Sequence, residues 1–344
     1  MASALPGWTV SAAPALPTPV ANNAVAAAVV DGRPYLFSFL GIGAGKDHRA
    51  ITTAAHSLDV ESGIWARIPD VPGRVGRLAA TAQAMGDRVF VFGGYEVAAD
   101  ATETTSAAVD IYDGRAHRYS RGADIPVPVD DVVSGVWRDR RIVLVSGWSM
   151  TKNVTDVQLY DPVADTWVAA TPIPGTPVFG HAGGVIGDTI VYCGGARMQA
   201  PRTPKYVPNA ECFRGDINPA GPARIAWRAI AHHPGATRYR AAAGPARIGG
   251  ADGVLFMGGT TNPYNINGVG YDGARSEPAA ESWFYDVGRD AWTEGPRLAA
   301  PTMDHRGLVS VAGAWWIVGG MGQGQAVTAA AARLAAAGVL DGPP

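Results

Sequence analysis

Short apolar runs that end in glycine recur along the chain, about 50–60 residues apart. In most copies two glycines follow the run directly, as in Val89–Phe92 before Gly93-Gly94. A continuous apolar run of this length suits a strand buried on both faces, and regular spacing predicts a repeat protein. The six runs are Leu36–Leu40, Val89–Phe92, Ile142–Val145, Ile190–Cys193, Leu255–Met257 and Trp315–Val318.

Each run belongs to a longer unit that predicts four antiparallel strands. Another strand-like run and a turn precede it, and an apolar-Tyr-Asp signature follows the glycines, as in Leu159-Tyr160-Asp161. A tryptophan such as Trp167 comes about six residues later and leads into a proline-containing loop. The glycines allow unusual φ angles near a crowded axis, and the aromatic side chains are suited to packing between neighbouring units.

The phased pattern of Gly-Gly, Tyr-Asp and Trp resembles the kelch family of β-propellers. The resemblance covers nearly the whole chain. It implies an all-β fold, a six-bladed kelch-type β-propeller with four antiparallel strands per blade, and residues 1–344 as a single domain.

The last unit begins near His305 and has no tryptophan strand of its own. The segment Trp8–Val10, followed by Leu16–Pro19, matches the tryptophan strand and proline loop of the other units. We therefore expect Trp8–Val10 to be the outer strand of the last blade, beside Ala326–Ala336. That blade is shared between residues 7–20 and 304–337, which closes the ring. Propensity alone favours a helix for the alanine-rich Thr328–Ala337, whereas its position in the repeat favours a strand.

Composition narrows the classes of partner. The net charge is −2, so nothing indicates a nucleic-acid surface, and 47% apolar residues support a large core. No apolar stretch is long enough for a membrane helix, so we expect no membrane partner. The opening Met1–Trp8 has no basic and apolar leader pattern. The expected compartment is the cytoplasm, or the periplasm if a signal peptide was removed.

The two cysteines, Cys193 and Cys212, are expected on strands of one blade. Whether they pair stays open, because disulfide geometry is demanding. No Cys-x-x-Cys spacing occurs, and we expect neither a metal nor a cofactor.

Candidate chemistry falls on one face, where loops enter the innermost strands and leave the glycine pairs. Arginine binds carboxylates in a bidentate fork, and aromatic rings stack on sugars, so we expect a small-molecule ligand, a carboxylated sugar. The long loop through Tyr264–Tyr271 is expected to form a lid over the pocket or a partner-binding loop, and we prefer the lid. The ligand-binding candidates are Arg77, Arg202, Arg240, Arg306, Asn23, Tyr95, Trp148 and Tyr239. The catalytic candidates are His305, Asp131 and His181.

The segments Gly194–Arg197 and Ala200–Thr203 resemble part of the N-acetylneuraminate epimerase (sialic acid mutarotase) family of bacterial propellers. Arg202 matches the family's functional arginine, and Ala196 stands where the family has a glutamate. The resemblance implies a sugar mutarotase or epimerase, an isomerase that needs an acid and a base at one anomeric oxygen. The alternative is a non-catalytic propeller that recognises a protein or peptide through the same loops.

Overall fold

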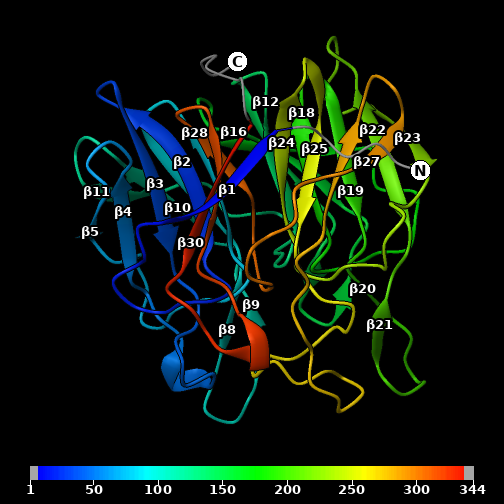
Figure 1. Ribbon diagram of the computed structural model, residues 1–344, viewed down its shortest axis with the longest axis horizontal. Helices are drawn as coiled ribbons and strands as arrows, with labels where there is room; N and C mark the ends of the chain where they lie inside the picture. Colours follow the sequence, from blue (N-terminus) through cyan, green and yellow to red (C-terminus); the bar gives the residue numbers. More distant parts are fainter. Residues whose placement is uncertain (1–6, 337–344) are drawn as a thin grey trace.

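The computed structural model describes residues 7–336, which form six four-stranded sheets around a central axis (Figure 1). Within each sheet, neighbouring strands are antiparallel. Blade 1 has β2 (Ala24–Val30), β3 (Arg33–Phe39), β4 (Ala55–Asp59) and β5 (Ile64–Ile68). Blade 2 has β6 (Thr81–Met85), β7 (Arg88–Phe92), β10 (Val109–Asp113) and β11 (Arg118–Arg121). Blade 3 has β12 (Val133–Trp137), β13 (Arg141–Val145), β16 (Val157–Asp161) and β17 (Thr166–Ala170).

The second half of the ring repeats this order. Blade 4 has β18 (Ala182–Ile186), β19 (Thr189–Cys193), β22 (Cys212–Ile217) and β23 (Ile225–Ile230). Blade 5 has β24 (Ala242–Ile248), β25 (Ala251–Met257), β26 (Ser282–Asp286) and β27 (Ala291–Glu294). Blade 6 has β28 (Val309–Val311), β29 (Ala314–Val318), β30 (Ala331–Ala336) and β1 (Trp8–Ala13). The predicted all-β, six-bladed fold is confirmed.

The ring closes in blade 6, where β1 pairs with β30 from Trp8 opposite Ala336 to Ala13 opposite Ala331 (Figure 1, blue beside red). The outer strand is therefore longer than the predicted Trp8–Val10. The alanine-rich segment forms a strand, because β1 and β29 flank it on both sides. The predicted positions Met1–Pro6 and Ala337 lie outside the described residues.

The innermost strand of each blade is rich in small residues, and the next strand carries the large apolar ones. β18 reads Ala-Gly-Gly-Val-Ile, for example, whereas β7 reads Arg-Val-Phe-Val-Phe. Inner strands of adjacent blades meet closely at the axis, and a side chain at Gly135 would collide with Val185 of the next blade. Close packing at the hub therefore selects small residues there, and larger ones fill the wedge further out.

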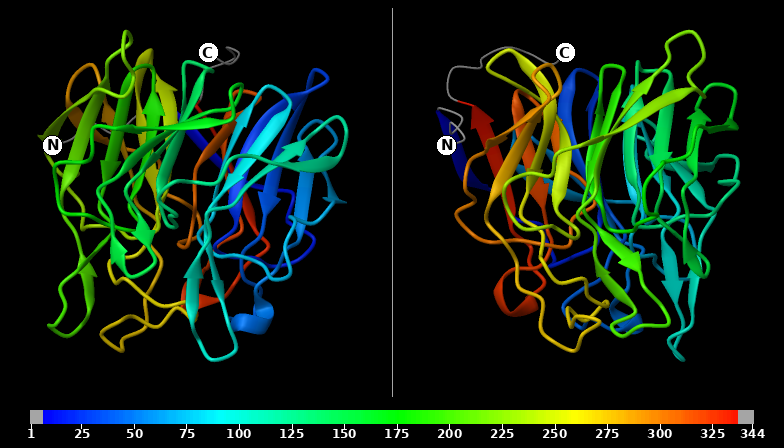
Figure 2. Two further views of the ribbon diagram at one scale, coloured as in Figure 1. Left: turned by 180° about the vertical axis from the view of Figure 1, so that it is seen from behind. Right: turned by 90° about the vertical axis from the view of Figure 1, so that its right-hand side faces the viewer.

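Two kinds of loop separate the two faces of the ring. Long connections gather on one face, at the bottom of Figure 1, and tight turns occupy the other (Figure 2). The long connections carry three small hairpins and two short 3-10 helices. These are β8 (Tyr95–Val97) with β9 (Glu103–Thr105), β14 (Trp148–Ser149) with β15 (Lys152–Asn153), β20 (Ala196–Met198) with β21 (Tyr206–Pro208), η1 (His48–Ala50) and η2 (Gln323–Gln325).

Cys193 and Cys212 form a disulfide between directly opposed positions of β19 and β22. Both side chains are buried between blades 4 and 5. None of the helices in the described part of the chain has the length and hydropathy to cross a membrane.

Candidate functional site

One residue per blade, at the same point of each repeat, forms a ring at the axis with left-handed backbone. The φ angles lie between 52° and 71°, a region that costs side chains other than glycine about 1 kcal/mol or more. Backbone hydrogen bonds link most of the ring from blade to blade; the Gly180 amide, for instance, donates to the Asp131 carbonyl, and the Arg240 amide donates to the Gly180 carbonyl. The six members of this hub ring are Asn22, Ala79, Asp131, Gly180, Arg240 and Asp304.

The polar side chains of the hub ring bind one another. Arg240 contacts Asp131 at 2.6 Å and Asp304 at 3.1 Å, and Arg306 is ion-paired with the same two carboxylates. Asn22 donates to Asp304 and accepts from the Arg306 Nε. These four charged side chains are almost fully buried. The sequence-predicted Asp131, Arg240 and Arg306 therefore do meet, but as a balanced network of two cations and two anions.

The network sets the charge state of its members. Burial disfavours the charged form of Asp131, but the attraction of Arg240 and Arg306 outweighs it, so its pKa is lowered. The neighbouring Asp130 has no such partner: burial and the negative charge of Asp131 raise its pKa well above the usual value. Asp130 accepts a hydrogen bond from Thr105 at 3.1 Å. The hub thus carries an ionised aspartate beside one that favours the protonated form.

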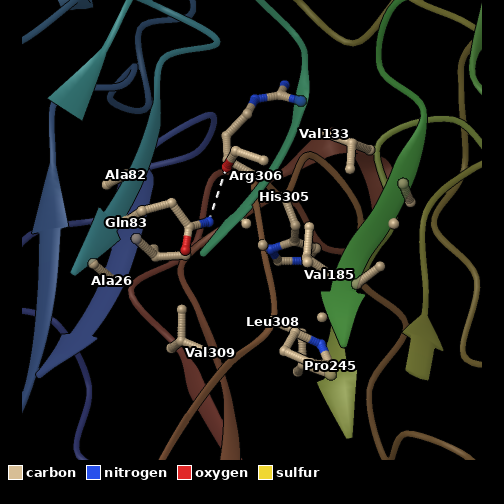
Figure 3. Close-up of a pocket in the computed structure, with 18 of the residues that line it drawn as sticks. Ala26, Ala82, Gln83, Val133, Val185, Pro245, His305, Arg306, Leu308 and Val309 are labelled. Atoms are coloured by element: carbon tan, nitrogen blue, oxygen red, sulfur yellow. Dashed lines mark hydrogen bonds between the residues drawn. The ribbon is translucent and has the colours of Figure 1, made fainter. Parts of the chain in front are cut away.

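A central cavity of about 210 Å³ extends from the hub along the inner strands, toward the face of tight turns (Figure 3). Arg306 lies at one end, and Pro245 and Leu308 lie at the other. The inner strand of each blade has one unpaired edge, which faces the axis. Backbone polar groups of these edges therefore line the central cavity. Pro245, which has no amide hydrogen, stands on the edge strand β24, where a missing donor costs least.

Both sequence-predicted histidines line this cavity. Burial lowers the pKa of His181 to about 4, and burial with the nearby Arg306 lowers that of His305 to about 3. The His181 Nε2 lies 3.0 Å from the Val145 carbonyl, and its Nδ1 is buried without a partner among the described residues. Both imidazoles are therefore neutral at pH 7 and are weak bases.

Two predicted ligand-binding residues point elsewhere. Arg77 forms a buried ion pair with Asp110 of blade 2 at 2.6 Å. Asn23 donates to the Ser38 Oγ at 2.9 Å and to a backbone carbonyl of blade 6. Neither side chain is part of the cavity lining. Their interactions hold neighbouring strands together instead.

The predicted aromatic residues gather on the long-loop side of the hub. Tyr95 and Tyr239 are buried in one apolar cluster, and Trp148 packs edge-on against Phe179 at its margin. Tyr264, from the expected lid, belongs to the same cluster, and no residue of that loop lines the cavity. The apolar cluster and the charged hub together cover the central cavity on this face. Arg202 is exposed in the turn between β20 and β21.

Sequence reasoning missed the polar wall of the cavity. The Gln83 Nε2 donates to the Ser134 Oγ at 2.9 Å (Figure 3). The Ser134 hydroxyl also bonds the Thr81 hydroxyl at 2.6 Å. Each of these residues interrupts a run of small apolar residues in an inner strand. That interruption was the available signal. In the described part of the chain, no three metal-ligating side chains come together.

Comparisons with known proteins find partial sequence matches. The chain is 32% identical over 127 residues to Kelch-like protein 15 of Gallus gallus, which covers 37% of this chain and 25% of that protein. It is 29% identical over 172 residues to Beta-scruin of Limulus polyphemus, which covers 47% and 18%. The chain spans a quarter or less of the length of these relatives. No protein-family model matches it.

The solved structure of YjhT superposes with a TM-score of 0.70 at 16% identity, and covers 92% of this chain and 95% of that one. At this identity the likeness concerns the fold alone. The fold is a six-bladed β-propeller of the kelch type.

Proposed function

We propose that this propeller binds a small polar molecule in the central cavity. The observation that carries the proposal is the gathering of His181, His305 and Arg306 with Gln83 and Ser134 around one central cavity. At about 30 Å³ per water, about 210 Å³ holds roughly seven waters. That volume suits a molecule of about hexose size better than a nine-carbon sugar acid.

The charge balance narrows the class of ligand. Arg306 is engaged by Asp131, Asp304 and Asn22, and Arg240 neutralises the same two carboxylates. A carboxylated ligand would therefore find no uncompensated cation at the hub. Neutral imidazoles and amide and hydroxyl groups suit the hydroxyls of a neutral sugar or polyol.

Sugar mutarotation remains the reaction to test, because it needs proton transfer at one anomeric oxygen. Two features favour binding without turnover. The lowered pKa values make both histidines weak bases, and Asp131 is held as an ion-paired carboxylate. Anomer exchange of a bound sugar, followed by NMR, should be unchanged by His305→Gln if the protein only binds.

A ligand screen by calorimetry tests the main proposal. Neutral hexoses and polyols are compared with hexuronic acids and sialic acid. We expect binding of a neutral member, lost in Gln83→Leu and kept in Val163→Ala, a control at an exposed outer turn. Absence of binding by every compound overturns the proposal. Loss in Arg202→Ala, with binding retained in Gln83→Leu, would assign the ligand to the long-loop face and also overturn it.

One observation favours a second function, protein recognition on the long-loop face. Met150 is 55% exposed at the tip of the β14–β15 hairpin, next to Trp148. The Lys205 Nζ lies 5.7 Å from the Trp148 ring and 5.0 Å from the Tyr206 ring. Methionine and aromatic side chains are enriched in protein interfaces. Affinity capture with the intact chain, compared with Met150→Asp, tests this role.

A further inference from the structure

A second cavity, of about 160 Å³, lies away from the hub between blades 1 and 6. The segment Thr18–Val20, which joins these blades, forms one wall, and the glycine loop after β3 forms another. Ser38 on β3 and His56 on β4 face it from directly opposed positions of the sheet. Ser38 is 3% exposed and His56 is 9% exposed.

The cavity exists because blade 1 departs from the repeat. Ser38 occupies the position held by a larger apolar residue in the other blades. Blade 1 therefore has a small hydroxyl side chain where the other blades have a large apolar one, and the difference in side-chain volume leaves the cavity. The residues at this position in the other five blades are Val91, Leu144, Tyr192, Phe256 and Ile317.

The residue at the position of His56 also differs from its counterparts in the other blades. In blade 2 its counterpart, Asp110, is paired with Arg77, and in blade 3 Gln158 bonds the backbone of Val127 twice. Blades 4 and 5 carry aromatic rings there. In the described part of the chain, His56 has no hydrogen-bond partner of its own. The His56 imidazole faces the cavity, so its ring nitrogens are free to bond a molecule bound there.

The polar side chains around the cavity can donate hydrogen bonds into it. The Ser38 oxygen already accepts from Asn23, and the Thr52 oxygen already accepts from the Ala54 amide. Each hydroxyl hydrogen is therefore left to donate into the space, and His56 adds an N–H. These three donors, together with the exposed Thr18 hydroxyl in the lining, favour a ligand rich in acceptors.

From this geometry we propose that the Ser38–His56 cavity binds a small carboxylate of about four to seven heavy atoms, such as acetate, lactate or pyruvate. The space holds roughly five waters at about 30 Å³ each. No charged side chain lines the cavity. The positive charge that pairs with the carboxylate is supplied by proton uptake on His56. Ser38 and Thr52 donate the remaining hydrogen bonds.

The charge around His56 is consistent with this linkage. Burial, and then the positive charge of Arg67, lower its pKa, and Asp70 opposes them. Arg67 on β5 is itself paired with Asp70 at 2.7 Å. The free protein therefore holds His56 neutral at pH 7, and a bound carboxylate would raise its pKa. Where binding takes up one proton, affinity increases up to tenfold for each pH unit lowered.

Titration of the intact protein with acetate, lactate and pyruvate, followed through the His56 imidazole resonance, tests the proposal. His56→Gln assigns that resonance. We expect saturable shifts, and affinity several-fold higher at pH 6.0 than at pH 7.5. Ser38→Val, which restores the apolar residue of the other blades, should abolish the shifts. Gln83→Leu in the central cavity should leave them unchanged, which separates this site from the function proposed above.

Several results would overturn the site. No shift with any of the three acids does so, as does an equal shift in Ser38→Val, or binding with no pH dependence. If Ser38→Val does not fold, Thr52→Val serves instead, because it keeps the shape and removes one donor. That variant should bind at least fivefold more weakly, and unaltered affinity counts against the proposal.

Discussion

Arg240 and Asp131 form an ion pair of 2.6 Å across the axis, although 109 residues separate them and blade 4 stands between their blades. Each side chain is no more than 3% exposed. The pair connects non-adjacent blades at the one place where all six converge. Its charges come from positions with left-handed backbone, so the hub combines local backbone strain with a long-range electrostatic contact.

Removal of one partner of this network should be strongly destabilising. Arg240→Met leaves two buried carboxylates with only Arg306 between them, and such a change costs about 3–5 kcal/mol. Urea unfolding measures it. Arg247→Ala, which breaks an exposed ion pair in the same blade, should cost less than about 1 kcal/mol. Equal effects of the two substitutions would contradict the role of the hub.

Stability should fall as the pH is lowered from about 6.5 to about 4. The pKa values of His181 and His305 are lowered to about 4 and about 3, so the unfolded chain binds more protons over this range. Each histidine then contributes a slope of about 1.4 kcal/mol per pH unit, and its full stabilisation is present only above about pH 6.5. Asp131, whose pKa is depressed, adds a loss that begins below about pH 4.

The pH dependence of the free energy of unfolding, and not its absolute value, tests whether His305 is a buried neutral group. Free energies of unfolding measured at pH 7, 6 and 5 should give a shallower pH dependence for His305→Gln than for the unaltered protein. An unchanged slope would mean that His305 is not the buried neutral group described here.

The seam of blade 6 should be a point of weakness. Trp315 is 7% exposed, and its ring lies 5.4 Å from that of Trp8 on β1. Trp315→Ala should therefore cost about 3–5 kcal/mol. Deletion of residues 1–13 would leave one edge of β30 unpaired, and an unpaired edge favours self-association. Size-exclusion chromatography should show oligomers of the shortened chain. A monomer of unaltered stability would contradict the closure.

The disulfide should stabilise blade 4. It links positions 19 residues apart, and loss of such a cross-link costs about 2–4 kcal/mol. Cys193→Ala with Cys212→Ala should lower the free energy of unfolding by that amount, and reductant should do the same to the unaltered protein. Rapid alkylation of the denatured, unreduced protein would show free thiols and disprove the bridge.

The repeat could be predicted because its signals lie close together in the sequence of each blade. Glycine pairs after apolar runs, Tyr-Asp signatures and tryptophans each impose a requirement on their own strand, and six phased copies make the requirements agree. The place where the ring closes was predicted from the same repeat pattern, because the last unit lacks a tryptophan strand and the segment at Trp8 supplies one. Strand limits were less well predicted, because pairing with β30 carried β1 on to Ala13.

The candidate site was only partly predictable. The loop positions told us that Asp131, Arg240, His181 and His305 face the axis, and they do. They did not predict that Arg240 forms an ion pair with Asp131, or that Arg77 forms one with Asp110. Which charge pairs with which depends on distances between blades, and no local pattern encodes those distances.

Sequence by itself therefore determined the number of blades, their four-strand order and the place of closure, because each rests on near-neighbour patterns of burial and turn formation. Only the tertiary structure decided where space and free polar groups remain. The neutral charge balance of the hub, the cavity along the axis and the hole left by Ser38 beside His56 all arise from packing between blades. Packing depends on side chains that the sequence separates and the ring brings together.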